Sequence, residues 1–424
     1  MPWRLLALLL TGQLLASMDV AILTVATPLL QRELDASPTM LQAIFASYTF
    51  AFGVLVVTGA RLGANHGHGN LFLIGLAGFT ASSLLCGLAP NAPTLLAGRL
   101  LQGTCGALMT PQTLQVIQQR FAGQARVKAV GYYSLVLSLG VLAGQLLGGV
   151  IVTAAGWRWA LLINVPVGLA LFVAARKPLR AQAAGHGKPL DLPGVATLTI
   201  AMALILVPLL LGREQGWPAW IWPSLAAGVG GLAVFARVED KPAPLLDLKV
   251  LPEIAPGLIM VSAVMGGYGA LIFCLTLHLQ NDLGYSPLQA GLAFAPYAAG
   301  FATVSITGRT IPPIALGIGA LLLATLPWSP LSELVLFFAG AGQASGFSPV
   351  VARTLATVEP QHAAEASSLL TTAALLAQVL AVATLGSLYL AHGFTAAAIG
   401  IAAVIAIAQL PRAAITSPTP TTSP

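Results

Sequence analysis

The chain has 424 residues, of which 57% are hydrophobic and only 8% are Asp, Glu, Lys or Arg. An ordinary soluble domain carries roughly 25% charged residues, so this composition excludes one and indicates that lipid surrounds most of the chain. The net charge of +6 could suggest a nucleic-acid partner, but the basic residues lie between apolar segments, which is typical of membrane topology. No nucleic-acid binding is therefore expected.

Apolar segments long enough to cross a bilayer, about 20 residues each, recur along the chain and predict about fourteen spans. They cover roughly 5–30, 40–62, 71–89, 93–118, 128–154, 158–175, 192–211, 219–237, 255–279, 287–308, 311–327, 331–352, 363–390 and 394–410. The eleventh is the weakest prediction, because it is short and opens with Pro312 and Pro313. The Thr-, Ser- and Pro-rich tail over 413–424 is predicted to be disordered.

Basic residues are distributed unevenly between the two sides of this topology. With the N-terminus in the cytoplasm and alternating helices, fifteen of the nineteen Lys and Arg residues face the cytoplasm. Arg32, Arg158 and Arg213 face outward, and Arg99 lies within a span. This is the positive-inside bias. It predicts a multi-pass protein of the bacterial inner membrane with both termini in the cytoplasm.

Two charged residues within spans are candidate functional groups. Asp19 lies deep in the first span, where a carboxylate costs about 2.5–3.5 kcal/mol on insertion scales, so it should face the bundle interior and could bind and release a proton. Arg99 opens a face with Gln102, Gly103 and Gly106 at helical spacing, and the glycines would admit another helix. A purely structural role for either charge is the alternative to proton coupling, and the sequence provides no distance between them.

A glycine stripe marks the fifth span. Gly140, Gly144 and Gly148 recur every four residues, and Gly149 stands beside the last. The spacing predicts close contact with another helix. That contact is either a moving seam or static packing, and the spacing alone does not distinguish them.

Several polar side chains within spans are candidates for lining a cavity, because an amide or phenol facing lipid is costly. The candidates are Tyr48, Gln102, Gln112, Gln145 and Tyr268. Five tryptophans at span boundaries are predicted to form an interfacial belt. They are Trp157, Trp159, Trp217, Trp220 and Trp222.

Standard enzyme patterns are absent from the sequence. It contains no GxSxG, HExxH, P-loop or CxxC motif, so a common hydrolase, an ATP-driven pump and a zinc or redox site are not indicated. Cys86, Cys105 and Cys274 lie in apolar segments and are predicted to be buried free thiols. Acidic residues other than Asp19 lie mostly in predicted loops, and no two carboxylates are expected to be buried together. We expect no enzyme activity, no cofactor and no metal.

Five segments resemble motifs of the major facilitator superfamily, specifically of its fourteen-span drug:proton antiporters. Residues 17–28 resemble the first-helix signature LDxTVVNVALP, and residues 96–103 resemble the fourth-helix motif RxxQGxG. Residues 140–149 resemble the fifth-helix antiporter motif GxxxGPxxGG, and residues 156–168 resemble GWRWIFLINVPIG. Residues 191–217 resemble the start of the extra helix pair of fourteen-span members.

The resemblance implies an all-α membrane protein with two six-helix bundles, each of inverted three-helix repeats, and two inserted central helices. The N-terminal bundle would occupy 1–180, the inserted pair with its linkers 181–250, and the C-terminal bundle 251–412. The implied function is a secondary transporter that exports small lipophilic or cationic compounds in exchange for protons. Asp19 would carry the proton and Arg99 would tune it. The proton gradient would supply the energy, and the implied partners are a small-molecule substrate, protons and the lipid bilayer, with the protein a monomer.

The chain departs from the resembled family at two motifs. The glycines and first arginine of the cytoplasmic loop pattern GRLADRFGRRR are kept at Gly59, Arg61, Gly63 and Gly67. Ala64 replaces the family's Asp, so the cytoplasmic latch that this Asp normally forms is in doubt. Gln145 replaces the proline of the fifth-helix motif, which makes a kink there less expected.

Three alternatives to export remain open on the sequence. The same fold could catalyse uptake, although the glycine stripe favours an exporter. The chain could be a degenerate, non-transporting sensor or partner subunit, which the altered loop motif favours. A membrane enzyme acting on lipids would need clustered intramembrane catalytic groups, and the sequence shows none.

Overall fold

The computed structural model describes residues 2–180, 189–241, 244–359 and 362–415, and all regular elements among them are helices. The first group comprises α1 (Pro2–Glu33), α2 (Pro38–His66), α3 (His68–Gly87), α4 (Ala92–Arg120), α5 (Gly123–Ala155), α6 (Trp157–Leu162) and α7 (Asn164–Arg180). A hairpin of α8 (Leu192–Leu211) and α9 (Ile221–Val238) follows.

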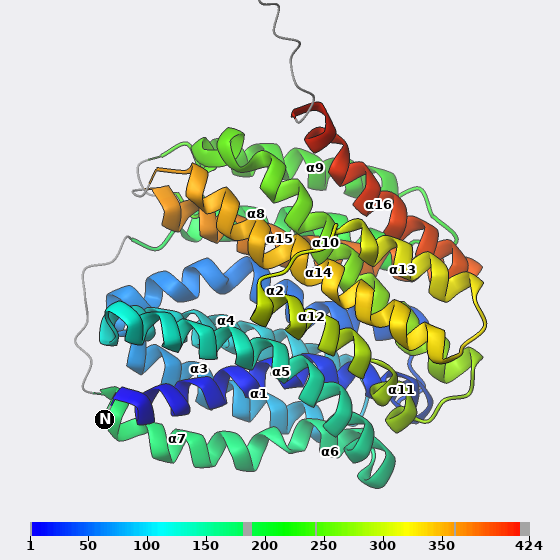
Figure 1. Ribbon diagram of the computed structural model, residues 1–424, viewed down its shortest axis with the longest axis horizontal. Coiled ribbons are helices and arrows are strands. Elements are labelled where there is room, and N and C mark those ends of the chain that lie inside the picture. The colour runs from blue at the N-terminus through cyan, green and yellow to red at the C-terminus, as the bar shows by residue number, and fades with distance from the viewer. Residues whose placement is uncertain (1, 181–188, 242–243, 360–361, 416–424) are drawn as a thin grey trace, which may run out of the picture.

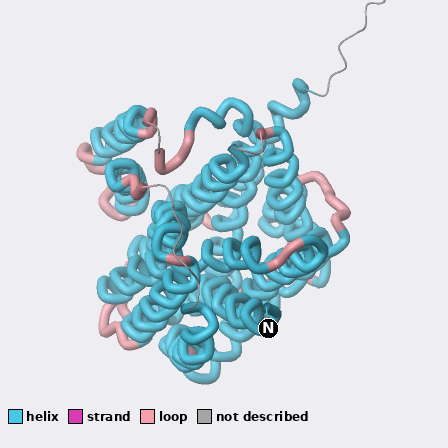
Figure 2. Tube along the Cα trace, turned by 90° about the vertical axis from the view of Figure 1, so that its left-hand side faces the viewer, coloured by secondary structure: helices cyan, strands magenta, loops and turns pink. Residues whose placement is uncertain are grey.

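The last group comprises η1 (Leu248–Val250), α10 (Leu251–Leu277), η2 (His278–Asp282), α11 (Pro287–Ala293), α12 (Ala295–Thr307), α13 (Ile314–Thr325), α14 (Pro330–Thr357), α15 (Ala363–His392) and α16 (Phe394–Ile415). In Figure 1 most of this group lies above the first, and α8 and α9 lie with it at the top. Figure 2 looks more nearly along the helices. Of the predicted disordered tail, 413–424, the structure describes only residues 413–415, and these continue α16. The predicted boundary between the N-terminal bundle and the inserted helix pair, at 180–181, adjoins residues 181–188, which lie outside the described residues.

Many of these helices can cross a bilayer. Among the described residues, ten segments are long and apolar enough. They are α1, α2, α3, α6 with α7, α8, α9, α10 with the short η1 and η2, α11 with α12, α14 and α15. The apolar stretches of α5, α13 and α16 are shorter, and α4 is not among the ten. The chain is therefore a multi-pass membrane protein, whereas the count of fourteen spans stays a prediction.

Loop residues set where several helices begin. Ser37, Asn91, Asp191 and Ser286 each precede a helix and accept a hydrogen bond from a backbone N–H three residues later. Proline occupies the first or second position of each of these helices, where its missing N–H is harmless. The helix boundaries thus follow from local chemistry as well as from apolar length.

Two predictions about individual residues can be compared with the structure directly. The three cysteines are free and buried, as predicted. Trp157 is not part of an interfacial belt, since it is fully buried and its Nε1 donates to Glu33 Oε2 at 2.9 Å. The other four boundary tryptophans are exposed. Span position alone did not reveal that Trp157 begins the short helix α6 and packs into a buried apolar cluster.

Candidate functional site

Asp19 and Arg99 form an ion pair inside the first group of helices. Asp19 comes from α1 and Arg99 from α4, and their side chains are 0% and 1% exposed. Arg99 Nη1 donates to Asp19 Oδ2. Each intramembrane charge therefore has its counter-ion, which is the usual requirement for a charge removed from water.

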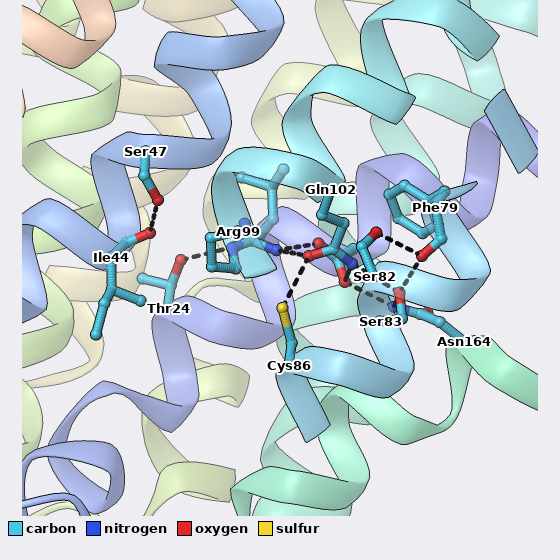
Figure 3. Close-up of polar contacts among 12 residues, drawn as sticks. Thr24, Ile44, Ser47, Phe79, Ser82, Ser83, Cys86, Arg99, Gln102 and Asn164 are labelled. Atoms are coloured by element: carbon cyan, nitrogen blue, oxygen red, sulfur yellow. Dashed lines mark hydrogen bonds and ion pairs between the residues drawn. The ribbon is translucent and has the colours of Figure 1, made fainter. Parts of the chain in front are cut away.

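Two amides complete the hydrogen bonding of the Asp19 carboxylate. Gln102 Nε2 donates to Asp19 Oδ1 at 2.8 Å, and Asn164 Nδ2 donates to the same oxygen at 2.6 Å. Gln102 also accepts from Arg99 Nη1 at 2.6 Å and donates to Ser83 Oγ at 2.8 Å. Figure 3 shows Arg99 and Gln102 with Ser83 and Asn164 in this cluster. We call Asp19, Arg99, Gln102, Asn164 and Ser83 the Asp19 network.

Asn164 and Ser83 did not emerge from the sequence as site residues. Asn164 is the first residue of α7, which continues the span that α6 begins, and it is 1% exposed. The only available signal was a polar side chain in an apolar segment that resembles a family motif. The helical pattern did not indicate that this position of the span faces Asp19.

Tyr48 packs against the other side of Arg99. The guanidinium carbon lies 4.6 Å from the Tyr48 ring centre, a cation–π contact. Gly103 and Gly106 allow this approach, since a Cβ added to Gly103 would lie 2.2 Å from the Tyr48 carbonyl oxygen and one on Gly106 would lie 2.8 Å from its hydroxyl. Tyr48 and Gln102 thus surround the ion pair and do not line the cavity described next.

A narrow cavity of about 10 Å³, with room for about one water molecule, lies between the two groups of helices. Its lining residues are Val20, Ala21, Thr24, Phe45, Gln145, Tyr268, Gly269, Ile272 and Gln378. They come from α1, α2, α5, α10 and α15, so both groups contribute. None carries a charge. Asp19 precedes Val20 in α1 but turns away from the cavity, into the first group.

Gln145 is the most unusual side chain in this lining. It is 2% exposed, and neither its Nε2 nor its Oε1 has a hydrogen-bond partner among the described residues. A buried amide without partners is destabilising by about 1–3 kcal/mol per group. Gln145 therefore offers one donor and one acceptor to a molecule in the cavity.

The glycine stripe packs against the helix that carries Asp19. An added Cβ would lie 2.5 Å from Ser17 Cβ at Gly140, 2.6 Å from the Met18 carbonyl oxygen at Gly144 and 3.1 Å from Ile22 Cα at Gly148. At Gly149 the near neighbour is Leu288 Cα of α11, at 2.8 Å. These four glycines therefore join α5 to α1 on one side and to the last group of helices on the other.

The two groups of helices are closed together at one end. Gln280 Nε2 donates to the Val25 carbonyl at 3.1 Å, and a Cβ on Gly291 would lie 2.4 Å from the Gln145 carbonyl oxygen. Further along α5, toward its start, Gly131 has no neighbour within 4 Å of an added Cβ. The end that carries Val25 and Gln280 is thus sealed, while α5 is free of close packing at Gly131.

Gln112 holds the motif that was predicted to form a cytoplasmic loop, whose Gly59, Arg61 and Gly63 lie within α2. Its Nε2 donates to the Gly59 carbonyl at 2.8 Å, and its Oε1 lies 2.7 Å from His68 Nδ1. An added Cβ on Gly63 would lie 1.9 Å from Gln112 Oε1, and Gly67 has φ +90°, a backbone conformation that favours glycine. Gln112 is fully buried here and does not line the cavity.

Arg61 reaches the segments that flank the α8–α9 hairpin. It donates to the Pro189 carbonyl at 3.2 Å, to the Leu245 carbonyl at 3.2 Å and to the Pro244 carbonyl. Beside it, Asp191 and Glu239 are only 5% and 4% exposed. The prediction that no two carboxylates are buried together is therefore wrong, because the hairpin brings its two ends side by side.

The model of the Major Facilitator Superfamily matches residues 9–382. The chain is 33% identical to a "Probable actinorhodin transporter" of Streptomyces coelicolor, over 91% of this chain and 72% of that protein. It is 33% identical to a puromycin resistance protein of Streptomyces alboniger, over 93% and 83%. It is 36% identical to a cephamycin export protein of Amycolatopsis lactamdurans, over 72% of this chain and 64% of that protein. The chain thus spans about two-thirds to four-fifths of these relatives.

Solved structures share the fold. A bacterial homologue of the lysosomal transporter Spinster, in an inward-facing and unoccupied conformation, aligns with a TM-score of 0.68 at 16% identity, over 96% of this chain and 95% of that one. A peptide transporter in complex with sulfate aligns with a TM-score of 0.73 at 15% identity, over 97% and 94%. At such identities the likeness concerns the fold alone.

Proposed function

The chain belongs to the major facilitator superfamily, and on that premise we propose that it is a proton-coupled antiporter that exports small lipophilic molecules. It is a multi-pass membrane transporter, and relatives at 33–36% identity carry names that describe transport, export or resistance for actinorhodin, puromycin and cephamycin. The proposal adds the energy source, the direction and the substrate class.

The observation that carries proton coupling is the buried Asp19–Arg99 pair beside the cavity. Asp19 adjoins Val20 of the cavity lining in sequence, and α1 also packs along the glycine stripe of α5. Protonation of Asp19 would neutralise the carboxylate that pairs with Arg99. The remaining contacts of the Arg99 guanidinium would be the hydrogen bond to Gln102 and the cation–π contact with Tyr48. The contact between α1 and α4 would then weaken, so protonation and helix movement would be linked through one carboxyl group.

The cavity favours an uncharged substrate over a cationic one. Its lining has no carboxylate to pair with a cation, and apolar side chains surround the amides of Gln145 and Gln378 and the ring of Tyr268. A neutral, largely apolar molecule with at least one donor and one acceptor would satisfy Gln145. We therefore favour the lipophilic half of the predicted substrate class.

We propose fourteen spans, namely the ten apolar segments together with α4, α5, α13 and α16. Both termini would then lie in the cytoplasm of a bacterial cell, the protein would sit in the inner membrane as a monomer, and the sealed end of the cavity would face outward. No cofactor would be needed, since the proton gradient supplies the energy.

The test is transport in vesicles under an imposed pH gradient. Everted membrane vesicles that contain the protein should take up a neutral compound with both hydrogen-bond donors and acceptors, such as radiolabelled chloramphenicol, when the interior is acidified, and collapse of the gradient should stop uptake. Asp19→Asn should abolish the gradient-driven part while leaving the protein in the membrane. Full gradient-driven uptake by Asp19→Asn would refute this coupling mechanism, and flux in the opposite direction would favour uptake by the same fold.

A further inference from the structure

Two carboxyl groups meet where the α8–α9 hairpin closes. Asp191 immediately precedes α8, and Glu239 immediately follows α9. Asp191 Oδ1 accepts from Lys241 Nζ at 2.5 Å, and Asp191 Oδ2 accepts from Leu245 N at 2.8 Å. Glu239 Oε2 accepts from Leu246 N at 2.7 Å. The pair therefore ties both ends of the hairpin to the linker that leads into α10.

One oxygen of this pair lacks a partner. Glu239 Oε1 is buried and has no hydrogen-bond donor among the described residues. An added Cβ on Gly194 would lie 2.3 Å from Glu239 Oε1 and 2.4 Å from Asp191 Oδ2, so these two oxygens are at most about 4.7 Å apart. Two buried carboxylates this close do not both ionise readily, and a single proton between them would supply the missing donor.

Two cations lie near the carboxylate pair. Arg61 of α2 is acted on electrostatically by Asp191, Glu239 and Glu365 of α15, and Lys241 is the second cation. The remaining charged groups on the adjoining described segments are Arg237, Asp240, Asp247, Lys249 and Glu253. Of these, Asp240 and Lys249 are exposed and pair with each other at 3.6 Å.

We propose that Asp191 and Glu239 form a second proton site, separate from Asp19, whose shared proton fastens the α8–α9 hairpin to α2 and α15. Arg61 would be the fastening point on α2, because it already donates to the carbonyls of Pro189, Pro244 and Leu245. Loss of the proton leaves two negatively charged carboxylates side by side in the site. Water then enters and the hairpin loosens. Both sites would bind only protons, so this inference does not depend on what the protein transports.

The titration falls in the physiological range. Burial, together with the neighbouring Asp191 charge, raises the pKa of Glu239 from 4.5 to about 7, against the opposing hydrogen bond from Leu246 N. Burial also acts to raise the pKa of Asp191, but hydrogen bonds with Lys241, Gly194 N, Glu239 and Leu245 N outweigh it and lower that pKa. Glu239 is thus the group that gains and loses the proton, and Asp191 keeps the charge.

The same fastening bears on alternating access. α2 belongs to the first group of helices and α15 to the last, and apolar side chains of α8 and α9 pack with both in one buried cluster. A hairpin fastened to both groups resists their separation at this end. We therefore expect a rise in cytoplasmic pH through about 7 to free the movement.

The experiment measures thermal unfolding of the purified full chain in nanodiscs between pH 5 and pH 8.5. The folded protein binds the Glu239 proton more tightly than the unfolded chain, so the stabilisation is complete below about pH 4.5 and is lost as pH rises through about 7. The Tm of the wild type should fall by a few degrees over this range. Glu239→Gln should remove that part of the fall, whereas Glu253→Gln, at an exposed glutamate of α10, should retain it.

An infrared measurement keeps the test decisive if Glu239→Gln does not fold. In an Asp19→Asn background, the carbonyl stretch of a protonated carboxylic acid should disappear as pH is raised through about 7. Its absence at pH 6, or its persistence at pH 8.5, would overturn the proposal. So would an unchanged fall of Tm in Glu239→Gln. Neither readout involves transport, so a negative result here is distinct from a failure of the proposed antiport.

Discussion

Asp19→Asn removes the anion of the buried ion pair while keeping its shape. Arg99, 1% exposed, would then lose its counter-ion and face a neutral amide. Removing one partner of a buried pair is destabilising by about 3–5 kcal/mol, because the other charge stays buried without compensation. We expect a loss of stability in this range.

Arg99→Met should be less damaging than Asp19→Asn. Gln102 and Asn164 still donate to the Asp19 carboxyl, and this carboxyl can take up a proton, so the expected loss is about 1–3 kcal/mol. The double variant Asp19→Asn/Arg99→Met removes both charges. Its loss should be smaller than the sum of the single losses by about 2 kcal/mol or more.

Equilibrium unfolding of the purified protein in mixed micelles, followed by tryptophan fluorescence, measures all three variants. Losses that add to within about 0.5 kcal/mol would show that the two charges are not coupled, and would refute the reasoning. Transport separates structure from function. If the double variant regains gradient-driven flux together with stability, the pair is structural only.

Three further changes test packing, the cavity and the buried tryptophan. Gly144→Ala places a Cβ 2.6 Å from the Met18 carbonyl oxygen and should lower unfolding stability by about 1–3 kcal/mol, whereas Gly131→Ala, with open space around its Cβ, should not lower it. Gln145→Leu should leave stability equal or higher, since it removes two unpartnered polar atoms, while reducing export of hydrogen-bonding substrates in a susceptibility assay; unchanged export would exclude Gln145 from substrate binding. Trp157→Phe loses the hydrogen bond to Glu33 and should lower unfolding stability by about 1–3 kcal/mol, which an unchanged denaturation midpoint would contradict.

The sequence by itself determined that lipid surrounds the chain, that its regular elements are helices, and that few charged residues lie within the spans. A chain in lipid must satisfy its backbone hydrogen bonds internally, so apolar length predicts helices. An intramembrane carboxylate or guanidinium is costly, so Asp19 and Arg99 stand out without any structure. The glycine spacing likewise predicted close helix contact but not the partner helix.

The tertiary structure alone decided which polar groups meet. Both the lipid and the bundle interior are apolar, so a membrane helix has little amphipathic period to indicate which face points inward. Gln112 and Gln145 therefore look alike in sequence, although Gln112 packs against Gly59 and Gly63 and Gln145 lines the cavity. Asn164 joins Asp19 only because the packing of the helices brings α7 beside α1. Asp191 and Glu239 meet only because a hairpin closes. The sequence pattern of a single helix indicates that the helix lies in an apolar environment. The contacts that form these sites join different helices, so they depend on how the helices pack.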